Sequence, residues 1–293
     1  MSPVHVVTRA ETVMAMDGVD PGVRERLAFA EELTRDAAAV ALRHFRERDA
    51  LVVESKGLQD VVSRADREVE ELIRSGLADR FPQDGFLGEE SGGGGDYERG
   101  AAWVVDPIDG TQCFLAGLPT WCVSVGLMVD GRIAAGVIVD PCADECFVGA
   151  VGAGAVCNGR PIAPIDTEDF RAGLTEVGFS FRIPKAPTVS FLDRLIDAGG
   201  MYHRSGSGAL GLAHVAAGRY VAYIEGHMNA WDSFAGAALV LAAGGWVNDL
   251  TAGDGITRGA IVMASGSRLA PALHAMADAA GFPLPDPPPG AGR

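Results

Sequence analysis

A chain of 293 residues that is 48% hydrophobic and 22% charged predicts a globular protein of about one to two domains with a sizeable core. The net charge of −15, from 39 acidic and 24 basic residues, would repel a nucleic acid backbone and excludes DNA or RNA as the expected partner. No segment approaches the roughly 18 apolar residues of a membrane span, and residues 1–18 lack the features of a signal peptide. We therefore expect a cytoplasmic protein that binds no membrane and whose cysteines are reduced thiols, because they are odd in number and form no CxxC pair.

The first part of the chain is predicted to be helical. Residues 1–20 show no regular pattern and are expected to be a disordered extension. Apolar side chains then recur at helical spacing over residues 23–48 and again over residues 65–81, where Pro82 interrupts the pattern. These two segments are predicted to be amphipathic helices.

The middle of the chain is predicted to be rich in β-strands. Residues 123–129 and 132–139 are largely apolar and are joined by Asp130-Gly131, which is a strong signal for a two-residue hairpin turn. The meander is expected to continue through residues 147–151 and through a strand that ends before Asn158-Gly159.

After about Pro164 the pattern changes to helices that alternate with short strands. These elements are expected at residues 189–198, 208–217, 220–225, 233–243, 246–249, 261–264 and 268–280. The Pro- and Gly-rich residues 283–293 are expected to be a disordered tail. We therefore predict two halves, an α+β half at 21–165 and an α/β half at 166–282.

The most informative segment is Ala101–Thr111, in which an apolar strand runs into Asp106 and Asp109. Pro107 cannot continue the hydrogen-bonded ladder, and Gly110 allows the chain to turn. The two carboxylates could therefore converge at the carboxyl end of the strand, where ligands of α/β folds gather. A helix that starts near Thr111 would add free N–H groups that favour an anion.

Other acids follow apolar runs in a similar way. Glu89 lies in a turn after residues 86–88, Asp232 precedes the helix predicted at 233–243, and Asp60 and Asp66 stand close together. Singly, each has a simpler interpretation, because Asp232 could cap its helix and Glu89 could be a solvated loop charge. Together they suggest a cation site, because converging carboxylates repel one another without a cation, and oxygen ligands alone favour Mg²⁺.

At these residues the chain resembles the inositol monophosphatase family, which consists of Mg²⁺-dependent, lithium-sensitive phosphatases. The matching segments occur in the family's order over most of residues 25–265, and the ordered set is far more specific than any single segment. The segments are Asp60–Asp66, Gly88–Ser91, Asp106–Thr111, Asn158-Gly159, Gly206-Ser207, and Trp231-Asp232 with Ala243–Gly245. The resemblance implies a layered α/β/α/β/α sandwich of the inositol monophosphatase and fructose-1,6-bisphosphatase type, which is usually a homodimer.

The resemblance also implies a site for about two to three Mg²⁺ ions. Glu89, Asp106 and the Ile108 carbonyl would hold one ion. Asp106, Asp109 and Asp232 would hold a second ion, and Glu89 would help to bind a third. The half at 21–165 would thus carry most of the metal ligands, and Glu89 would count among the catalytic residues.

The catalytic roles follow from the same resemblance. Asp60 and Thr111 would orient and deprotonate the water that attacks phosphorus in line. The backbone N–H groups of Gly110 and Thr111 would bind the phosphate oxygens. The expected activity is the hydrolysis of a small phosphate monoester, and metal ions would stabilise the charge that develops on the phosphoryl group.

The chain departs from the family pattern at a few positions. Gln112-Cys113 stand where the family usually has Thr-Asn, Ser63 replaces a common Thr, and Ala242 stands where Glu is frequent. These departures remove no metal ligand, so they bear on the substrate and on local packing.

Several residues are candidates for substrate binding. Glu225 lies seven residues before Asp232, where inositol-specific relatives carry a Glu that contacts substrate hydroxyls. The further candidates for the pocket wall are Arg204, Ser207, Ala209 and His227. We favour inositol-1-phosphate or a related polyol or sugar phosphate. Histidinol phosphate is the alternative, because Gly117–Trp121 resembles phosphatases of that compound.

Two hypotheses come from other functional classes. Gly206–Gly211 matches the spacing of a dinucleotide-binding fingerprint, which requires a preceding strand, and residues 201–204 make a poor one. A non-catalytic regulator that binds metal or ligand is the other alternative, but such a protein would not need both Asp60 and Thr111. A serine hydrolase is not indicated, because the chain has no GxSxG motif.

Overall fold

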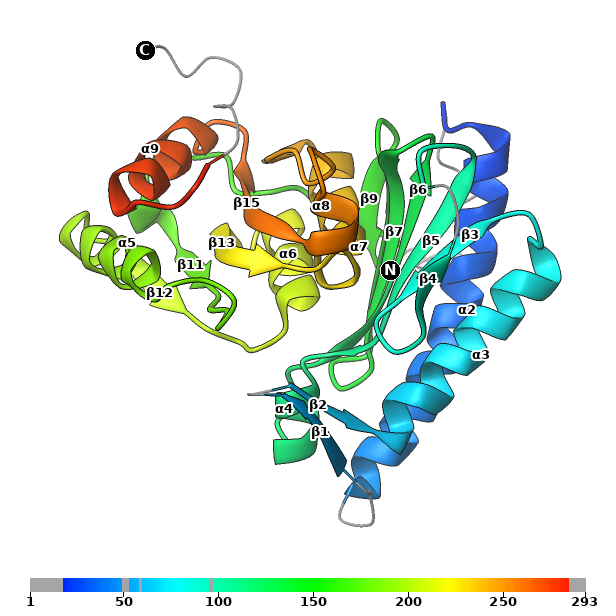
Figure 1. Ribbon diagram of the computed structural model, residues 1–293. Coiled ribbons are helices and arrows are strands. Elements are labelled where there is room, and N and C mark those ends of the chain that lie inside the picture. Colours follow the sequence, from blue (N-terminus) through cyan, green and yellow to red (C-terminus); the bar gives the residue numbers. More distant parts are fainter. Residues whose placement is uncertain (1–17, 49–52, 58–59, 95–96, 285–293) are drawn as a thin grey trace, which may run out of the picture.

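The computed structural model of the chain describes residues 18–48, 53–57, 60–94 and 97–284. Helices α2 (Pro21–Arg46) and α3 (Arg64–Arg80) cover one face of an eight-stranded sheet (Figure 1). Helices α6 (Gly208–Ala216) and α7 (Ala230–Ala242) lie between this sheet and a five-stranded sheet. Helices α5 (Ala186–Asp197) and α9 (Ala270–Ala280) cover the other face of the five-stranded sheet. This arrangement confirms the predicted α/β/α/β/α layering. The predicted extension and tail lie largely outside the described residues.

The eight-stranded sheet has the strand order β10-β9-β8-β7-β6-β5-β3-β4 and is antiparallel except where β3 pairs with β5. Its strands are β3 (Gly85–Gly88), β4 (Gly92–Gly94), β5 (Ala101–Asp109), β6 (Cys122–Val129), β7 (Arg132–Asp140), β8 (Glu145–Ala150), β9 (Gly154–Cys157) and β10 (Arg160–Pro161). Strand β5 is buried along almost its whole length, as expected for a central strand with helices on both faces.

The hairpin predicted at Asp130-Gly131 is present. Both residues have positive φ, 48° at Asp130 and 73° at Gly131, which a type I′ turn requires. The turn fixes the register of β6 on β7, in which Val129 pairs with Arg132. A local sequence signal therefore determined this part of the sheet.

The five-stranded sheet has the order β12-β11-β13-β15-β14. Its strands are β11 (Leu174–Val177), β12 (Met201–His203), β13 (Tyr220–Met228), β14 (Gly245–Val247) and β15 (Ala260–Gly266). Strands β12 and β13 both run parallel to β11, so the carboxyl ends of these three strands meet at one edge. The expectation of a poor strand at 201–204 was wrong, because backbone pairing with β11 holds β12 at the sheet edge despite its exposed side chains.

Helix α7 packs directly on the backbone of the eight-stranded sheet. Gly126 and Gly136 face each other on β6 and β7, and a Cβ atom at Gly136 would lie 2.3 Å from the Ala235 carbonyl oxygen. The two glycines therefore let α7 approach closely, and this contact fixes the height of the helix above the sheet. The N-terminal turn of α7 is thereby set beside the end of β5.

The remaining elements are short. They are β1 (Val53–Gly57) and β2 (Asp60–Ser63), which form a two-stranded sheet, with α4 (Thr111–Ala116), the 3-10 turn η2 (Phe170–Ala172) and α8 (Gly255–Arg258). All five cysteines are free thiols, as predicted. Among the described helices, none is long and apolar enough to cross a membrane.

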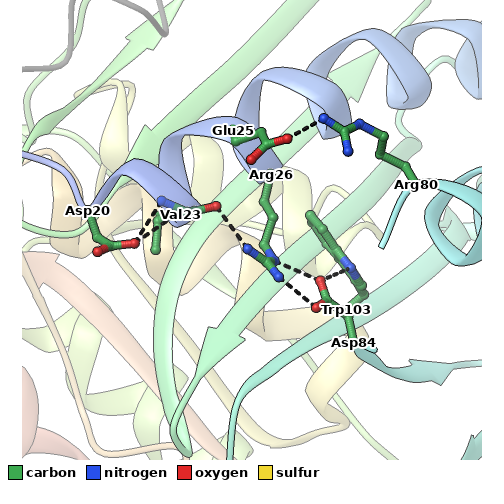
Figure 2. A network of polar contacts seen from close by, with 8 residues as sticks. Asp20, Val23, Glu25, Arg26, Arg80, Asp84 and Trp103 are labelled. Atoms are coloured by element: carbon green, nitrogen blue, oxygen red, sulfur yellow. Dashed lines mark hydrogen bonds and ion pairs between the residues drawn. The ribbon is translucent and has the colours of Figure 1, made fainter. Parts of the chain in front are cut away.

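A polar network ties α2 to the first strands of the eight-stranded sheet (Figure 2). The Arg26 guanidinium donates two hydrogen bonds of 2.7 Å to the Asp84 carboxylate, which also accepts the Trp103 indole N–H at 3.0 Å. The Asp84 side chain is only 4% exposed, so it needs these donors to compensate for its burial. The network thus joins α2, the segment before β3, and β5.

Candidate functional site

Strand β5 brings two carboxylates to its carboxyl end. The Asp106 and Asp109 side chains are 2% and 8% exposed, and the pairing of β5 with β6 shifts register between them. Pro107 has no N–H to donate, and the Ile108 N–H donates to the Asp106 carboxylate at 2.9 Å. The break in the β-ladder therefore lets both carboxylates converge at the carboxyl end of β5, as the sequence predicted.

Asp232 lies at the N-terminus of α7. The helix begins at Ala230, earlier than predicted, because Asn229 serves as its N-cap and forms a capping box with Asp232. The Asp232 carboxylate accepts hydrogen bonds from the backbone N–H of Asn229 at 3.0 Å and from its side chain at 3.1 Å. Asp232 is therefore a capping residue and also a member of the acidic group.

Asp106, Asp109 and Asp232 form a compact cluster in which one oxygen atom from each lies within 4.8 Å of the others. Burial raises the pKa of all three carboxyl groups, and the charges of Glu89 and Asp109 raise the pKa of Asp106 further. Three ionised carboxylates in such a space repel one another unless a cation neutralises them. The oxygen-only donor set fits a hard divalent cation, so this group could bind a metal ion.

Asp109 is anchored by the N-terminus of α6, in the helix layer between the two sheets. Its carboxylate accepts a hydrogen bond from the Ser207 hydroxyl and one from the Ala209 backbone N–H at 2.8 Å. Ala209 was predicted to contact substrate, but its side chain is fully buried and only its N–H reaches the cluster. The N-terminus of α6 is therefore already occupied by a carboxylate of the protein itself.

This anchoring also explains the glycine pattern of Gly206–Gly211. A Cβ atom at Gly206 would lie 2.6 Å from the Cys113 sulfur, and one at Gly208 would lie 2.4 Å from Met228. The glycines serve close packing around the site. Although β12 and α6 supply the strand and helix that a dinucleotide site needs, the helix terminus contacts Asp109, which argues against such a site.

Glu89 lies in the turn between β3 and β4 and is half-buried. A buried carboxylate on α3, Glu70, accepts the backbone N–H groups of Glu90 at 2.8 Å and Ser91 at 2.7 Å. The turn that carries Glu89 is thus held by a side chain that the sequence reasoning did not single out. Glu89 is near enough to Asp106 for its charge to raise the pKa of that carboxyl.

Thr111 begins α4 and lies close to two candidate residues. Its hydroxyl donates to the Ile108 carbonyl at 3.0 Å and lies 3.5 Å from the carboxylate of Asp66, which is buried. Asp60 belongs to β2, but its side chain lies outside the described part, so its predicted pairing with Thr111 stays a prediction. Asp66 is the acid that the structure places beside Thr111.

Gly110 precedes α4 with a φ of 95°, a conformation that favours glycine. A Cβ atom at Gly110 would also lie 2.8 Å from the Thr120 carbonyl oxygen, so a larger residue would displace the loop. This turn connects Asp109 directly to Thr111.

A pocket of about 550 Å³ opens over the acidic cluster. Its walls include the cluster, the start of α4, and the ends of β11, β12 and β13. The predicted residues Glu89, Ile108, Gly110, Thr111, Arg204, Ser207, Glu225 and His227 all line it, as do Asp106, Asp109 and Asp232. Burial raises the pKa of Glu225 to about 7, and the Tyr223 hydroxyl donates to its carboxylate at 2.7 Å. A small metabolite would fit in this volume.

Two charged residues of the pocket wall were missed in the sequence. Glu176 on β11 is 2% exposed and accepts hydrogen bonds from the backbone N–H and the hydroxyl of Ser205, at 2.6 and 2.8 Å. Arg182 lies in the loop after β11, and its charge lowers the pKa of Asp232 against the effect of burial. No local pattern distinguishes either residue; their position depends on the pairing of β11 with β12 and β13.

Comparison with known proteins gives consistent matches. The model of the inositol monophosphatase family matches residues 23–280. The Nus factor SuhB of Xylella fastidiosa is 39% identical over 222 residues, which cover 75% of this chain and 80% of that protein.

Two solved structures have the same fold. The extragenic suppressor protein suhB of Bartonella henselae has a TM-score of 0.77 and 31% identity, covering 86% of this chain and 97% of that chain. The inositol monophosphatase of Anabaena (Nostoc) has a TM-score of 0.74 and 32% identity, covering 90% of this chain and 98% of that chain. Because the family model spans the candidate site and both sheets, the chain belongs to the inositol monophosphatase family, as its sequence motifs predicted.

Proposed function

We propose that the protein hydrolyses a small phosphate monoester with the help of Mg²⁺. The observation that carries this proposal is the cluster of the buried Asp106 and Asp109 with the half-buried Asp232, at the base of a pocket large enough for a metabolite. Ionisation of these carboxylates so close together is unfavourable without a neutralising charge. Bound cations therefore best explain the cluster. Membership of a phosphatase family supports the same chemistry.

We assign the following roles to the residues of this chain. Asp106, Asp109 and Asp232, with Glu89 and the Ile108 carbonyl, would hold the Mg²⁺ ions. Bound Mg²⁺ would supply charge for the phosphoryl oxygens and the leaving group.

Thr111 would position the attacking water together with an acidic residue. Asp60 is the partner that the family resemblance implies, and Asp66 is the acid seen 3.5 Å from the Thr111 hydroxyl. The backbone N–H groups of Gly110 and Thr111 would bind phosphate oxygens, and these groups lie beside the proposed metal ligand Asp109, which directly precedes Gly110.

For the substrate we favour inositol-1-phosphate or a related polyol or sugar phosphate. Glu225 supports this choice, because its carboxylate lines the pocket and could accept hydrogen bonds from ligand hydroxyls while Tyr223 fixes its orientation. Histidinol phosphate remains the alternative, since Gly117–Trp121 resembles its phosphatases.

A non-catalytic role is the competing proposal from another class. The relative from Xylella fastidiosa carries the name Nus factor, as does the SuhB protein of Escherichia coli, which is 32% identical over 251 residues. Such a role would require binding of metal or ligand but no turnover. The distinction is therefore made by measuring hydrolysis.

The decisive experiment is phosphate release from a substrate panel with Mg²⁺ or with EDTA. The panel contains inositol-1-phosphate, histidinol phosphate, fructose 1,6-bisphosphate and 3′-phosphoadenosine 5′-phosphate. We expect Mg²⁺-dependent release that falls at least about a hundredfold in Asp106→Asn. Asp278→Asn, on the exposed side of α9, is the matched control. Metal binding without release of phosphate from any compound would favour the regulator instead.

A further inference from the structure

Two arginines leave neighbouring strands at the same edge of the five-stranded sheet. Arg204 directly follows β12, and Arg182 lies in the loop after β11. The two strands run parallel, with Glu176 paired to His203, so both arginines follow the carboxyl ends of their strands. Both line the pocket that contains the acidic cluster.

Neither arginine forms a salt bridge with a described residue, whereas other arginines of the protein do. Arg26 pairs with Asp84, and Arg219 pairs with Glu145. The Arg182 charge lowers the pKa of Asp232 and the Arg204 charge lowers that of Glu225, in each case against the effect of burial. The side chains of Arg182 and Arg204 are exposed, and neither makes a hydrogen bond or salt bridge with any described residue. In a chain of net charge −15, two exposed guanidinium groups without a salt bridge in one pocket are available to a ligand.

The backbone around each arginine is held in place. Glu176 accepts the Ser205 N–H at 2.6 Å and contacts the His203 ring at 2.7 Å, which fixes the residues on either side of Arg204. The Arg182 N–H donates to the Ser180 hydroxyl at 3.3 Å. The two cationic groups are therefore carried by backbone segments that are already held in place, so only the arginine side chains would have to be ordered when a ligand binds.

We propose that Arg182 and Arg204 form a second anion-binding subsite, and that the substrate carries another phosphate or a carboxylate besides the phosphate that is hydrolysed. This inference rests on the proposed phosphatase function, and within it favours a sugar phosphate with a second anionic group over inositol-1-phosphate and histidinol phosphate, which carry only one. The scissile phosphate would lie at the metal ligands and at Gly110 and Thr111, so it does not require the arginines. Guanidinium groups bind phosphate and carboxylate through paired N–H donors, and both anions share this chemistry.

Two matched pairs of compounds test the proposal. Fructose 1-phosphate is compared with fructose 1,6-bisphosphate, and glycerol 2-phosphate is compared with 2-phosphoglycerate. The wild type should prefer the compound with the additional anion in at least one pair by about tenfold in kcat/KM, mainly through KM. The first pair reports on a second phosphate and the second pair on a carboxylate.

Arg182→Gln and Arg204→Gln should each lower kcat/KM for the preferred compound about tenfold more than for its partner compound. Arg132→Gln is the matched control, because Arg132 is also exposed and without a salt bridge among the described residues but lies outside the pocket. The proposal fails if the wild type shows no preference in either pair. It also fails if the variants lower both members of a pair equally, because the arginines would then bind the scissile phosphate.

The result is distinguishable from a failure of the proposed function. If the wild type hydrolyses neither these four compounds nor any member of the substrate panel above, the phosphatase proposal is wrong, and calorimetric binding of the same pairs with Mg²⁺ tests the subsite by itself. Tighter binding of the compound with the additional anion that is lost in the two variants supports the subsite. Equal binding within both pairs contradicts it.

Discussion

The Asp109 carboxylate accepts the backbone N–H of Ala209 at 2.8 Å, across 100 residues of sequence. This hydrogen bond, together with one from the Ser207 hydroxyl, joins the end of β5 to the N-terminus of α6. One carboxylate is therefore both a candidate metal ligand and a connection between the eight-stranded sheet and the helix layer beneath it. The donors fix its orientation and favour its ionised form, which is the form that binds metal.

Removal of the Ser207 hydroxyl should weaken metal binding. In Ser207→Ala the pKa of Asp109 rises further, because the hydrogen bond that lowers it is lost. We expect the Mg²⁺ concentration for half-maximal phosphatase activity to increase about tenfold or more. Ser190→Ala on α5, whose hydroxyl accepts a surface contact from Arg194 and lies outside the pocket, is the control. An unchanged Mg²⁺ requirement would show that Ser207 does not support the metal site.

The stability of the metal-free protein should depend on the pH through the same carboxylate. Burial and the neighbouring Asp232 raise the pKa of Asp109 to about 7, above its unfolded value near 3.9. The folded state therefore binds more protons, so this contribution to stability is present at low pH and is lost as the pH rises from about 4 to about 7. In EDTA, the fall in Tm between about pH 5 and about pH 7.5 should be smaller for Asp109→Asn than for the wild type.

Comparison of the two proteins removes the effects of other groups, such as His214, whose pKa is lowered by burial to about 4. Added Mg²⁺ should raise the Tm of the wild type more at the higher pH, because metal binding requires ionised carboxylates. An equal pH dependence in wild type and variant would contradict the raised pKa of Asp109.

Whether a site residue could be predicted depends on whether a local sequence pattern or a long-range contact brings it to the pocket. Asp106 and Asp109 were found because a strand, a proline and a turn lie together in one short segment. Arg182 and Glu176 were not found, because they reach the pocket through the parallel pairing of β11 with β12, whose register no local pattern specifies. Strand β12 was also misjudged, since an edge strand of three residues with exposed side chains shows no alternation.

The layers of the fold were easier to predict than the contacts between them. Asp130-Gly131 fixed a hairpin, and amphipathic spacing located α2 and α3 to within about two residues. Asp232 was predicted to precede its helix, but Asn229 supplies the N-cap, so the helix begins earlier in the chain, at Ala230. Such a capping box depends on side-chain geometry that the spacing of apolar residues does not report.

Loss of the Asp84 carboxylate should destabilise the protein. In Asp84→Ala the Arg26 guanidinium and the Trp103 N–H both lose their acceptor in a mostly buried environment (Figure 2). We expect the free energy of unfolding, measured by urea denaturation, to fall by about 3 kcal/mol. Glu25→Gln is the control, because its pairing with Arg80 lies on the surface and should contribute little. Equal stability losses in both variants would refute the role of the buried network.

The carboxylate of Glu70 should position Glu89 for metal binding. Glu70 accepts two backbone N–H groups in the turn after Glu89, and the Gln side chain of Glu70→Gln would turn an N–H donor toward one of them. We expect kcat/KM to fall about tenfold and the Mg²⁺ requirement to rise, and the Mg²⁺-free Tm to fall as well, because a backbone N–H loses its acceptor. A change in the Mg²⁺ requirement separates positioning from a general loss of stability.

The neighbouring residue provides a matched control for this substitution. Glu71 lies on the exposed side of α3, where it contacts Arg74 and Ser75 and not the turn. Glu71→Gln should therefore leave both the Mg²⁺ requirement and kcat/KM unchanged. If Glu70→Gln also leaves the Mg²⁺ requirement unchanged, the turn holds Glu89 without Glu70. If instead both variants weaken Mg²⁺ activation equally, the effect comes from the loss of negative charge on α3, because electrostatic attraction of the cation does not require contact with the turn.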